Sequence, residues 1–137
     1  MVKDEFNFSL QRFAYITGTS SSETISNSDS WWTTIEAGKG NDTIYNTGSN
    51  VLINAGAGKD SIENRGAQVT VDGSDGNDKI FNQGSNASLV GGQGDDSIFN
   101  DGWYATIDGG SGDDTIRNSQ NNFVTIAGGD ENFFLKA

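Results

Sequence analysis

The central part of the sequence repeats itself every 18 residues. A segment of the form Gly-x-Asp-x-Ile or Gly-x-Asp-Lys-Ile begins at residues 40, 58, 76, 94 and 112, and the interval never changes. An apolar residue also lies about nine residues after most of the isoleucines, as Ile53 follows Ile44. Each repeat therefore holds two short strands and two turns, a period typical of proteins that stack one coil on the next.

This periodicity predicts an all-β fold, a parallel β-solenoid with 18 residues per coil and about seven coils. Because side chains alternate along a strand, residues two apart share a face. The inward-facing residues of the first strand are then Asp42, Ile44, Asn46 and their equivalents. Those of the second strand are Val51, Ile53, Ala55 and their equivalents. Such a core is only two strands wide, which explains a hydrophobic fraction of only 33%.

One polar column at the end of the first strand has a structural explanation. It consists of Asn46, Asn64, Asn82, Asn100 and Asn118. Stacked about 4.8 Å apart, asparagine amides form hydrogen-bonded ladders, as they do in cross-β assemblies. We therefore expect this column to satisfy buried polar groups and assign it no chemistry.

Composition excludes several classes of function. The formal net charge is −11, which disfavours nucleic acid as a partner because phosphate binding needs basic patches. The chain has no cysteine and no histidine, so disulfides, zinc–thiolate sites and the commonest general base are absent. No apolar stretch approaches a membrane span, so no membrane insertion is expected. An acidic surface suits metal cations.

The repeat extends with small changes toward both ends. A shift of 19 aligns Glu23–Asn27 with Asp42–Asn46, and a second shift aligns Asp4–Phe8 with Glu23–Asn27; Asn132–Phe134 is expected to follow Asp114–Ile116 at 18. We therefore predict one solenoid domain over 1–137. It divides into divergent N-terminal coils (1–36), regular calcium-binding coils (37–126) and a C-terminal half coil (127–137).

The glycine-rich turns match the pattern G-G-x-G-x-D-x-U-x. Here the sequence resembles the RTX (repeats-in-toxin, hemolysin-type calcium-binding) family, whose nonapeptides wind into a parallel β-roll. The resemblance implies calcium between the turns of neighbouring coils, held by aspartates and by carbonyls of the glycine turns. The implied ligands are Asp42, Asp60, Asp78, Asp96 and Asp114, with Gly38, Gly40, Gly56, Gly58, Gly73, Gly76, Gly92, Gly94, Gly110 and Gly112.

Electrostatics also favours a cation at these turns. Stacking places the five aspartates in one inward-facing column with neighbours about 5 Å apart, so the carboxylates must protonate or bind cations. Calcium accepts six to eight oxygens in flexible geometry, whereas magnesium is stricter. In the second turns the aspartate position holds Val51, Val69, Ala87, Ala105 and Phe123, so only one edge should bind calcium. Five turns define four gaps, and we expect about four ions; Lys59, Glu23 and Asn132 weaken the outer sites.

The two ends are apolar, and this suggests self-assembly. Phe6, Phe8, Leu10 and Phe13 mark the first coil, and Phe133, Phe134 and Leu135 mark the last. One molecule's last coil could be continued by the next molecule's first, a contact that does not close and therefore makes fibres. The alternative is that these aromatics fold back as a local lid. The leading hypothesis is a secreted, non-enzymatic structural protein that polymerises head to tail into an extracellular filament or surface matrix.

A second hypothesis is a calcium-dependent carbohydrate-binding or adhesin module, with glycans as partners. Tyr45, Phe81 and Phe99 are expected to point outward in one column, and Trp103 and Tyr104 lie on a second turn. Catalysis is the least favoured class, because calcium turns already use every inward carboxylate. The family resemblance further implies export of the unfolded chain by type I secretion and an extracellular or cell-surface location.

Overall fold

The computed structural model describes residues 2–8, 11–28, 32–119, 123–129 and 133–136, and all of its regular elements are β-strands. No helix that could cross a membrane occurs among these residues. The strands are β1 (Val2–Phe8), β2 (Gln11–Thr17), β3 (Thr24–Asn27), β4 (Thr33–Glu36), β5 (Thr43–Asn46), β6 (Val51–Asn54), β7 (Ser61–Asn64), β8 (Thr70–Asp75), β9 (Lys79–Asn82), β10 (Ser88–Gln93), β11 (Ser97–Asn100), β12 (Thr106–Ser111), β13 (Asp114–Asn118), β14 (Thr125–Ala127) and β15 (Phe133–Lys136).

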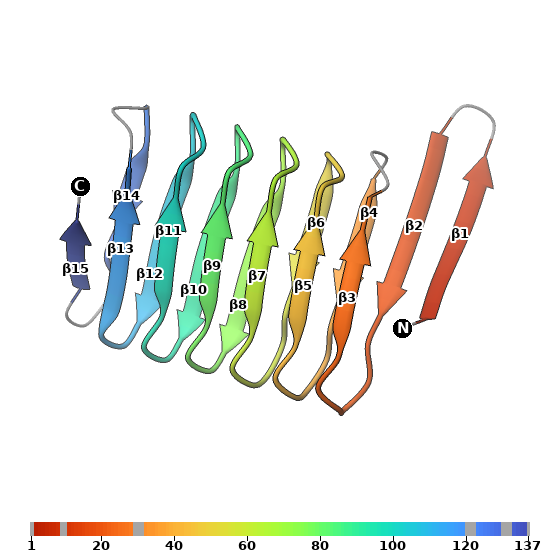
Figure 1. Ribbon diagram of the computed structural model, residues 1–137, viewed down its shortest axis with the longest axis horizontal. Helices are drawn as coiled ribbons and strands as arrows, with labels where there is room; N and C mark the ends of the chain where they lie inside the picture. The colour runs from red at the N-terminus through yellow and green to blue at the C-terminus, as the bar shows by residue number, and fades with distance from the viewer. Residues whose placement is uncertain (1, 9–10, 29–31, 120–122, 130–132, 137) are drawn as a thin grey trace.

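The strands form a parallel β-solenoid of about six turns with about 18 residues each, close to the seven coils predicted. Sheet A has the order β1-β2-β4-β6-β8-β10-β12-β14, and sheet B has the order β15-β13-β11-β9-β7-β5-β3. The glycine-rich turns lie along one long edge of the rod and the asparagine turns along the other (Figure 1). Each coil therefore contacts mainly the coils before and after it.

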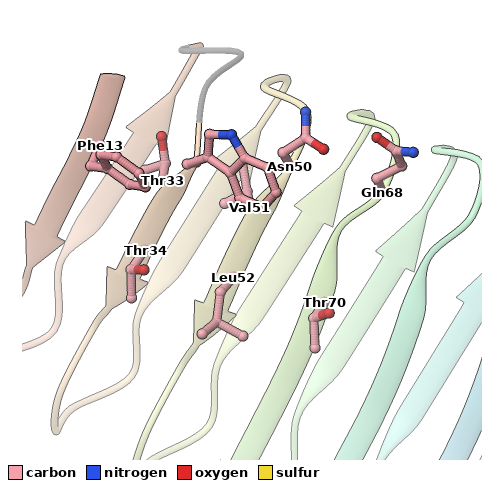
Figure 2. Close-up of a pocket in the computed structure, with 9 residues that line it drawn as sticks. Phe13, Thr33, Thr34, Asn50, Val51, Leu52, Gln68 and Thr70 are labelled. Atoms are coloured by element: carbon pink, nitrogen blue, oxygen red, sulfur yellow. The ribbon is translucent and has the colours of Figure 1, made fainter. Parts of the chain in front are cut away.

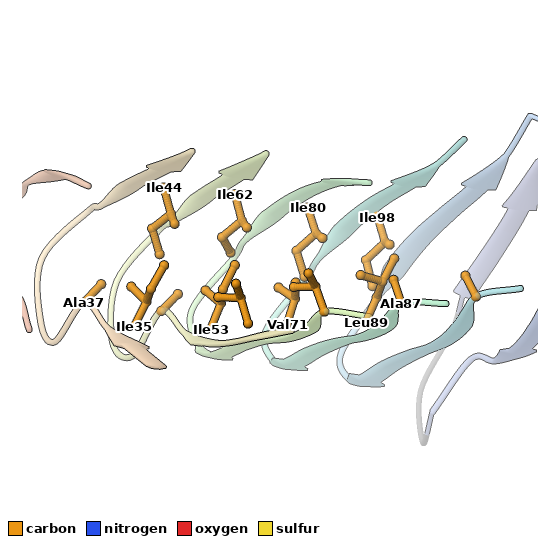
Figure 3. Close-up of a cluster of buried hydrophobic side chains, with 14 of the residues drawn as sticks. Ile35, Ala37, Ile44, Ile53, Ile62, Val71, Ile80, Ala87, Leu89 and Ile98 are labelled. Carbon is orange, nitrogen blue, oxygen red and sulfur yellow. The ribbon is translucent and has the colours of Figure 1, made fainter. Parts of the chain in front are cut away.

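The core is the predicted two-strand layer of aliphatic side chains. Ile44, Ile62, Ile80 and Ile98 of sheet B point toward Ile35, Ile53, Val71 and Leu89 of sheet A (Figure 3). Each of these side chains is at most 1% exposed. Burial of such side chains supplies about 1.5–3 kcal/mol each. The predicted inward positions are thus confirmed, and their partners two residues along the strands, such as Thr43 and Leu52, lie on the outside.

The prediction for the N-terminal coil is wrong. Strand β1 does not follow β3 into sheet B; it pairs antiparallel with β2 in sheet A, with Phe6 opposite Phe13. Only two residues separate β1 from β2, which suffices for a hairpin, whereas a parallel connection needs about a dozen residues or more. Sheet A therefore has one strand more than sheet B at this end.

The register of the last coil also differs from the prediction. Ile126 pairs with Ile107, and Phe133 and Leu135 pair with Asp114 and Ile116, so the interval is 19 rather than 18. Phe123, predicted to face inward, is 72% exposed, whereas Val124 packs against the core. A one-residue slip exchanges the two faces of a strand, and this register places Val124 and Ile126 on the core side.

Candidate calcium-binding edge

The glycine turns of successive coils stack so closely that side chains have no room. A Cβ atom on Gly56 would lie 1.9 Å from the Gly38 carbonyl oxygen, and one on Gly76 would lie 1.6 Å from that of Gly58. These glycines also have positive φ angles, 98° and 130°, which L side chains rarely adopt. The turns therefore place backbone carbonyls against one another at the spacing of the strands.

The five aspartates form the expected column inside this edge. Asp42, Asp60, Asp78, Asp96 and Asp114 are all at most 2% exposed. Each carboxylate is held by one hydrogen bond from the preceding coil: the backbone N–H of Asp60 donates to Oδ1 of Asp78 at 2.8 Å, and that of Asp78 donates to Oδ1 of Asp96 at 2.8 Å. This bond fixes the direction of the carboxyl plane in every coil.

The second oxygen of each of these carboxylates has no hydrogen-bond partner. Oδ2 is buried and unpartnered in all five aspartates. A point at the Cβ position of Gly91 lies 2.4 Å from both Asp96 Oδ2 and the Gly109 carbonyl oxygen, and the equivalent point on Gly73 lies 2.5 Å from Asp78 Oδ2 and the Gly91 carbonyl oxygen. Acceptors thus converge without a donor between them. Because buried acceptors without donors are costly, this arrangement favours a cation.

Burial raises the pKa values of these carboxyl groups. Loss of solvent is the largest cause, and neighbouring carboxylates add to it, while the backbone hydrogen bond acts in the opposite direction. The pKa rises to about 6 for Asp60, about 7 for Asp78 and about 6 for Asp96. Near neutral pH the column must therefore carry protons or neutralising cations.

The RTX calcium-binding nonapeptide repeat model matches four copies in this chain, over residues 38–65, 81–99 and 106–122. The chain carries RTX repeats. No curated protein and no solved structure gives a significant match. Asp78 lies between the matched stretches, but the ladder pairs its coil with both neighbours in the same register, so it belongs to the same RTX column.

The chemistry of this edge fits calcium. Among the described residues, no group of three or more carboxylates lies together in the manner of a metal cluster made by side chains alone. Backbone carbonyls of the RTX turns would therefore have to complete the coordination, and calcium readily combines carboxylate and carbonyl oxygens. Asp78 and Asp96, with the carbonyls of Gly91 and Gly109, are the residues that would hold an ion in the central gaps.

The predicted glycines all lie on this edge, but in two different roles. Positive φ angles occur at Gly38, Gly40, Gly56, Gly58, Gly76, Gly92, Gly94, Gly110 and Gly112. Gly73 instead ends the inward face of its strand, next to Asp78. The prediction missed its equivalents Gly91 and Gly109, which lie next to Asp96 and Asp114. The doubled glycines Gly91-Gly92 and Gly109-Gly110 were the available signal.

The column changes at both margins. At the first coil, Glu23 aligns with Asp42, but its carboxylate accepts hydrogen bonds from the N–H and hydroxyl of Thr19 in its own turn. These bonds lower the pKa of Glu23, in contrast to the aspartates. At the last coil, Phe133 pairs with Asp114, and Asn132 lies outside the described residues. Five aspartates and four gaps thus form the regular part.

The opposite edge contains no equivalent of this acidic column. Val51, Val69, Ala87 and Ala105 are buried at the corresponding positions, as predicted. The asparagine ladder is confirmed there. Asn64 Nδ2 donates to Asn82 Oδ1 at 2.7 Å and to the Gly66 carbonyl at 2.9 Å, while its own Oδ1 accepts from Gly66 N–H and from Asn46. An amide has two donors and two lone pairs, so every site is used.

Proposed function

We propose that this RTX protein is a calcium-dependent structural solenoid without catalytic activity. The observation that carries the proposal is the buried column of five aspartates, each with one oxygen that has no hydrogen-bond partner beside glycine carbonyls. Without a cation these carboxylates oppose winding, and with one they hold neighbouring coils together. The carboxylates face inward and are fixed by backbone N–H groups, which supports a structural role rather than acid–base catalysis.

The calcium requirement supports a secreted, extracellular or cell-surface location. A ligand that binds only the folded state stabilises that state in proportion to ln(1 + [L]/Kd). Cytosolic calcium is scarce, so the acidic column keeps the chain unfolded there, and millimolar calcium outside winds the coils. This behaviour suits type I export of an unfolded chain, as the family resemblance implies.

Head-to-tail self-assembly is the finer part of the proposal. Sheet B ends in β3 at one end of the rod and β15 at the other, and both strands pair with only one neighbour in the chain. They run parallel to the strands between them, so β15 of one copy has the direction needed to continue β3 of the next (Figure 1). Open strand edges readily pair with other chains. The filament would be held by such contacts.

Electron microscopy of the full chain in millimolar calcium, with and without EDTA, tests the assembly. We expect filaments in calcium and none in EDTA. A lysine on an edge strand discourages pairing, so Thr24→Lys on β3 should shorten or abolish the filaments. Thr106→Lys, on the internal strand β12, is the matched control and should leave them unchanged.

Two results would contradict the assembly. One is a calcium-loaded monomer at high concentration. The other is a discrete dimer, in which the extra strand β1 of each copy pairs beside β3 of its partner; β1 and β3 run in the same direction (Figure 1). Sedimentation in calcium separates a dimer from an open filament. Neither result touches the calcium-dependent winding, which circular dichroism measures by itself.

A further inference from the structure

A column of planar side chains runs along the outer face of sheet A, next to the asparagine turns. It holds the residue just before the first inward position of each strand, as set by the register of the sheet. The aromatic members lie toward the two ends: Phe13, Trp32, Tyr104 and Phe123. The amide members lie between them: Asn50, Gln68 and Asn86. We call this set the planar column.

The aromatic members of the planar column present their rings to solvent. Phe13 is 40% exposed, Trp32 and Tyr104 are each 55% exposed, and Phe123 is 72% exposed. The rings of Tyr104 and Phe123 stack with centroids 5.4 Å apart and planes only 6° from parallel. By contrast, Phe81 and Phe99 on sheet B are half-buried and stack on each other. The exposed aromatic surface therefore concentrates on sheet A.

The backbone of the planar column gives an independent indication of a role for these side chains. Trp32, Asn50, Gln68, Asn86 and Tyr104 have φ angles of 31°, 59°, 58°, 55° and 57°. This left-handed region suits glycine and, less well, asparagine, and it is unfavourable for bulky residues. Glycine would relieve the strain at Trp32, Gln68 and Tyr104. Strained positions that keep large side chains point to a function of those side chains.

The neighbouring column on the same face is rich in hydroxyl groups. It contains Tyr15, Thr34, Leu52, Thr70, Ser88, Thr106 and Thr125. Neither this column nor the planar column contains a charged residue, although the chain has a formal net charge of −11. Acidic side chains return only in the next column along, at Glu36, Asp72 and Asp108. The two columns form an uncharged strip on an acidic rod.

The N-terminal part of this strip is hollowed into a groove of about 560 Å³. Leu52 and Thr70 project from the outer face of sheet A, Asn50 and Gln68 lie at the turn ends of their strands, and Phe13 lies at one end (Figure 2). Trp32 also lines the groove. The groove thus combines an aromatic surface with amide and hydroxyl groups, and no charged residue lines it.

We propose that this strip binds a neutral, extended polysaccharide that lies along the rod axis. The faces of sugar rings carry C–H groups that pack on aromatic rings, and their hydroxyls pair with amides and hydroxyls. Successive coils are about 4.8 Å apart, a length similar to one pyranose unit of an extended chain, so the strip offers about one polar row per sugar. Anionic polymers are disfavoured by the charge of the rod.

This role goes beyond the structural function proposed above and uses a different surface. It is tested by calorimetric titration of the full chain in millimolar calcium with three neutral hexasaccharides: cellohexaose, xylohexaose and mannohexaose. Polygalacturonate is the anionic comparison. We expect saturable binding of at least one neutral probe and weaker or absent binding of polygalacturonate. Absence of binding to all three neutral probes, or a preference for polygalacturonate, overturns the proposal.

Variants locate the site. Trp32→Ala and Tyr104→Ala should each lower the affinity about tenfold, as expected for exposed aromatic anchors. Thr70→Glu places a charge in the strip without removing core packing and should also lower it. Tyr45→Ala, an exposed aromatic on sheet B, is the matched control. Circular dichroism in calcium confirms that each variant is wound.

The competing occupant is a second copy of the chain packed side by side. Sedimentation of the unliganded protein distinguishes the two. If Trp32→Ala converts a dimer to a monomer while hexasaccharide affinity stays unchanged, the strip is a protein interface and the proposal is wrong. Equal affinities in Tyr45→Ala and Trp32→Ala variants would overturn it as well.

Discussion

The two edges of this solenoid solve the same problem in opposite ways. Both bury a column of short polar side chains at one position per coil. The asparagine column satisfies itself, because each amide donates to the next amide and to a glycine carbonyl and accepts two hydrogen bonds in return. The aspartate column leaves one oxygen of each carboxylate without a partner. One edge is complete in the polypeptide, and the other needs something from solution.

The difference lies in a single chemical group. Asparagine and aspartate have nearly the same shape, but the amide carries two donors, whereas the carboxylate has only acceptors. A column of donors and acceptors closes on itself, and a column of acceptors can close only around protons or cations. Stability of the whole rod should therefore be limited by the acidic edge and tunable through it.

Removal of calcium is expected to have the largest effect on this comparison. In EDTA at pH 8 the acidic column is uncompensated, and we expect the β-sheet signal in circular dichroism to be lost and to return on addition of excess calcium. Magnesium should restore much less. A chain that stays fully wound in EDTA would contradict the account of the acidic edge.

Acid should partly replace calcium. The pKa values of about 6 for Asp60 and Asp96 and about 7 for Asp78 exceed the ordinary value of 3.8. The unfolded chain therefore binds fewer protons than the folded chain between these values, and stability without metal falls as pH rises through this window. In EDTA we expect more wound protein at pH 5 than at pH 8. Calcium competes with the protons, so its affinity should rise from pH 5 to pH 8; light scattering checks for aggregation.

Breaking the self-satisfied column should be costly and independent of calcium. Asn82→Ala leaves a donor of Asn64, an acceptor of Asn100 and groups of Gly84 without partners. We expect a loss of about 2–4 kcal/mol in the free energy of unfolding in saturating calcium. The number of bound ions should not change. Gln83→Ala, at the exposed neighbouring position, should cost less than about 0.5 kcal/mol.

Exchanging the chemistry of one edge for that of the other should reverse sign with calcium. Asp78→Asn removes a buried charge and supplies donors beside the Gly91 carbonyl. Without metal it should stabilise the chain by about 1 kcal/mol, and in calcium it should destabilise it and reduce the bound ions. Asp75→Asn, an exposed aspartate in the same turn, should do neither. Urea titrations with and without EDTA measure both signs.

The smallest expected effect concerns a single gap. A methyl group on Gly91 would lie 2.4 Å from Asp96 Oδ2 and from the Gly109 carbonyl oxygen, and the φ angle there is not in the left-handed region. Gly91→Ala should therefore obstruct one ion site with little effect on the backbone. We expect calorimetry to report a weaker or missing site, with the other sites retained. An unchanged stoichiometry and affinity would place the ion elsewhere.

The regular coils were predictable because each is constrained on both sides. A fixed interval of 18 residues places Ile44, Asp42 and Asn46 in columns, and any slip would turn the aliphatic side chains outward. The end coils have one neighbour each. There the pattern allowed either Thr125 or Ile126 over Ile107, and one added residue in the preceding turn decided for Ile126.

Other features depend on contacts that no pattern displays. The hairpin of β1 and β2 follows from its two-residue connection, although Asp4–Phe8 resembles Glu23–Asn27 in sequence. The unpartnered oxygens appear only once Oδ1 is seen to accept a backbone N–H. The planar column was missed because its members lie in the turn just before each strand, at positions such as Gln68, where strand alternation makes no statement.

The constant interval between the glycine turns also bears on how such a chain can change its size. Because each coil touches mainly its two neighbours and presents the same interface to both, duplication of residues 73–90 would insert one further rung, and deletion of the same stretch would remove one. Length, and with it the number of ions carried, can therefore evolve by whole 18-residue steps without redesign of the hydrophobic interior.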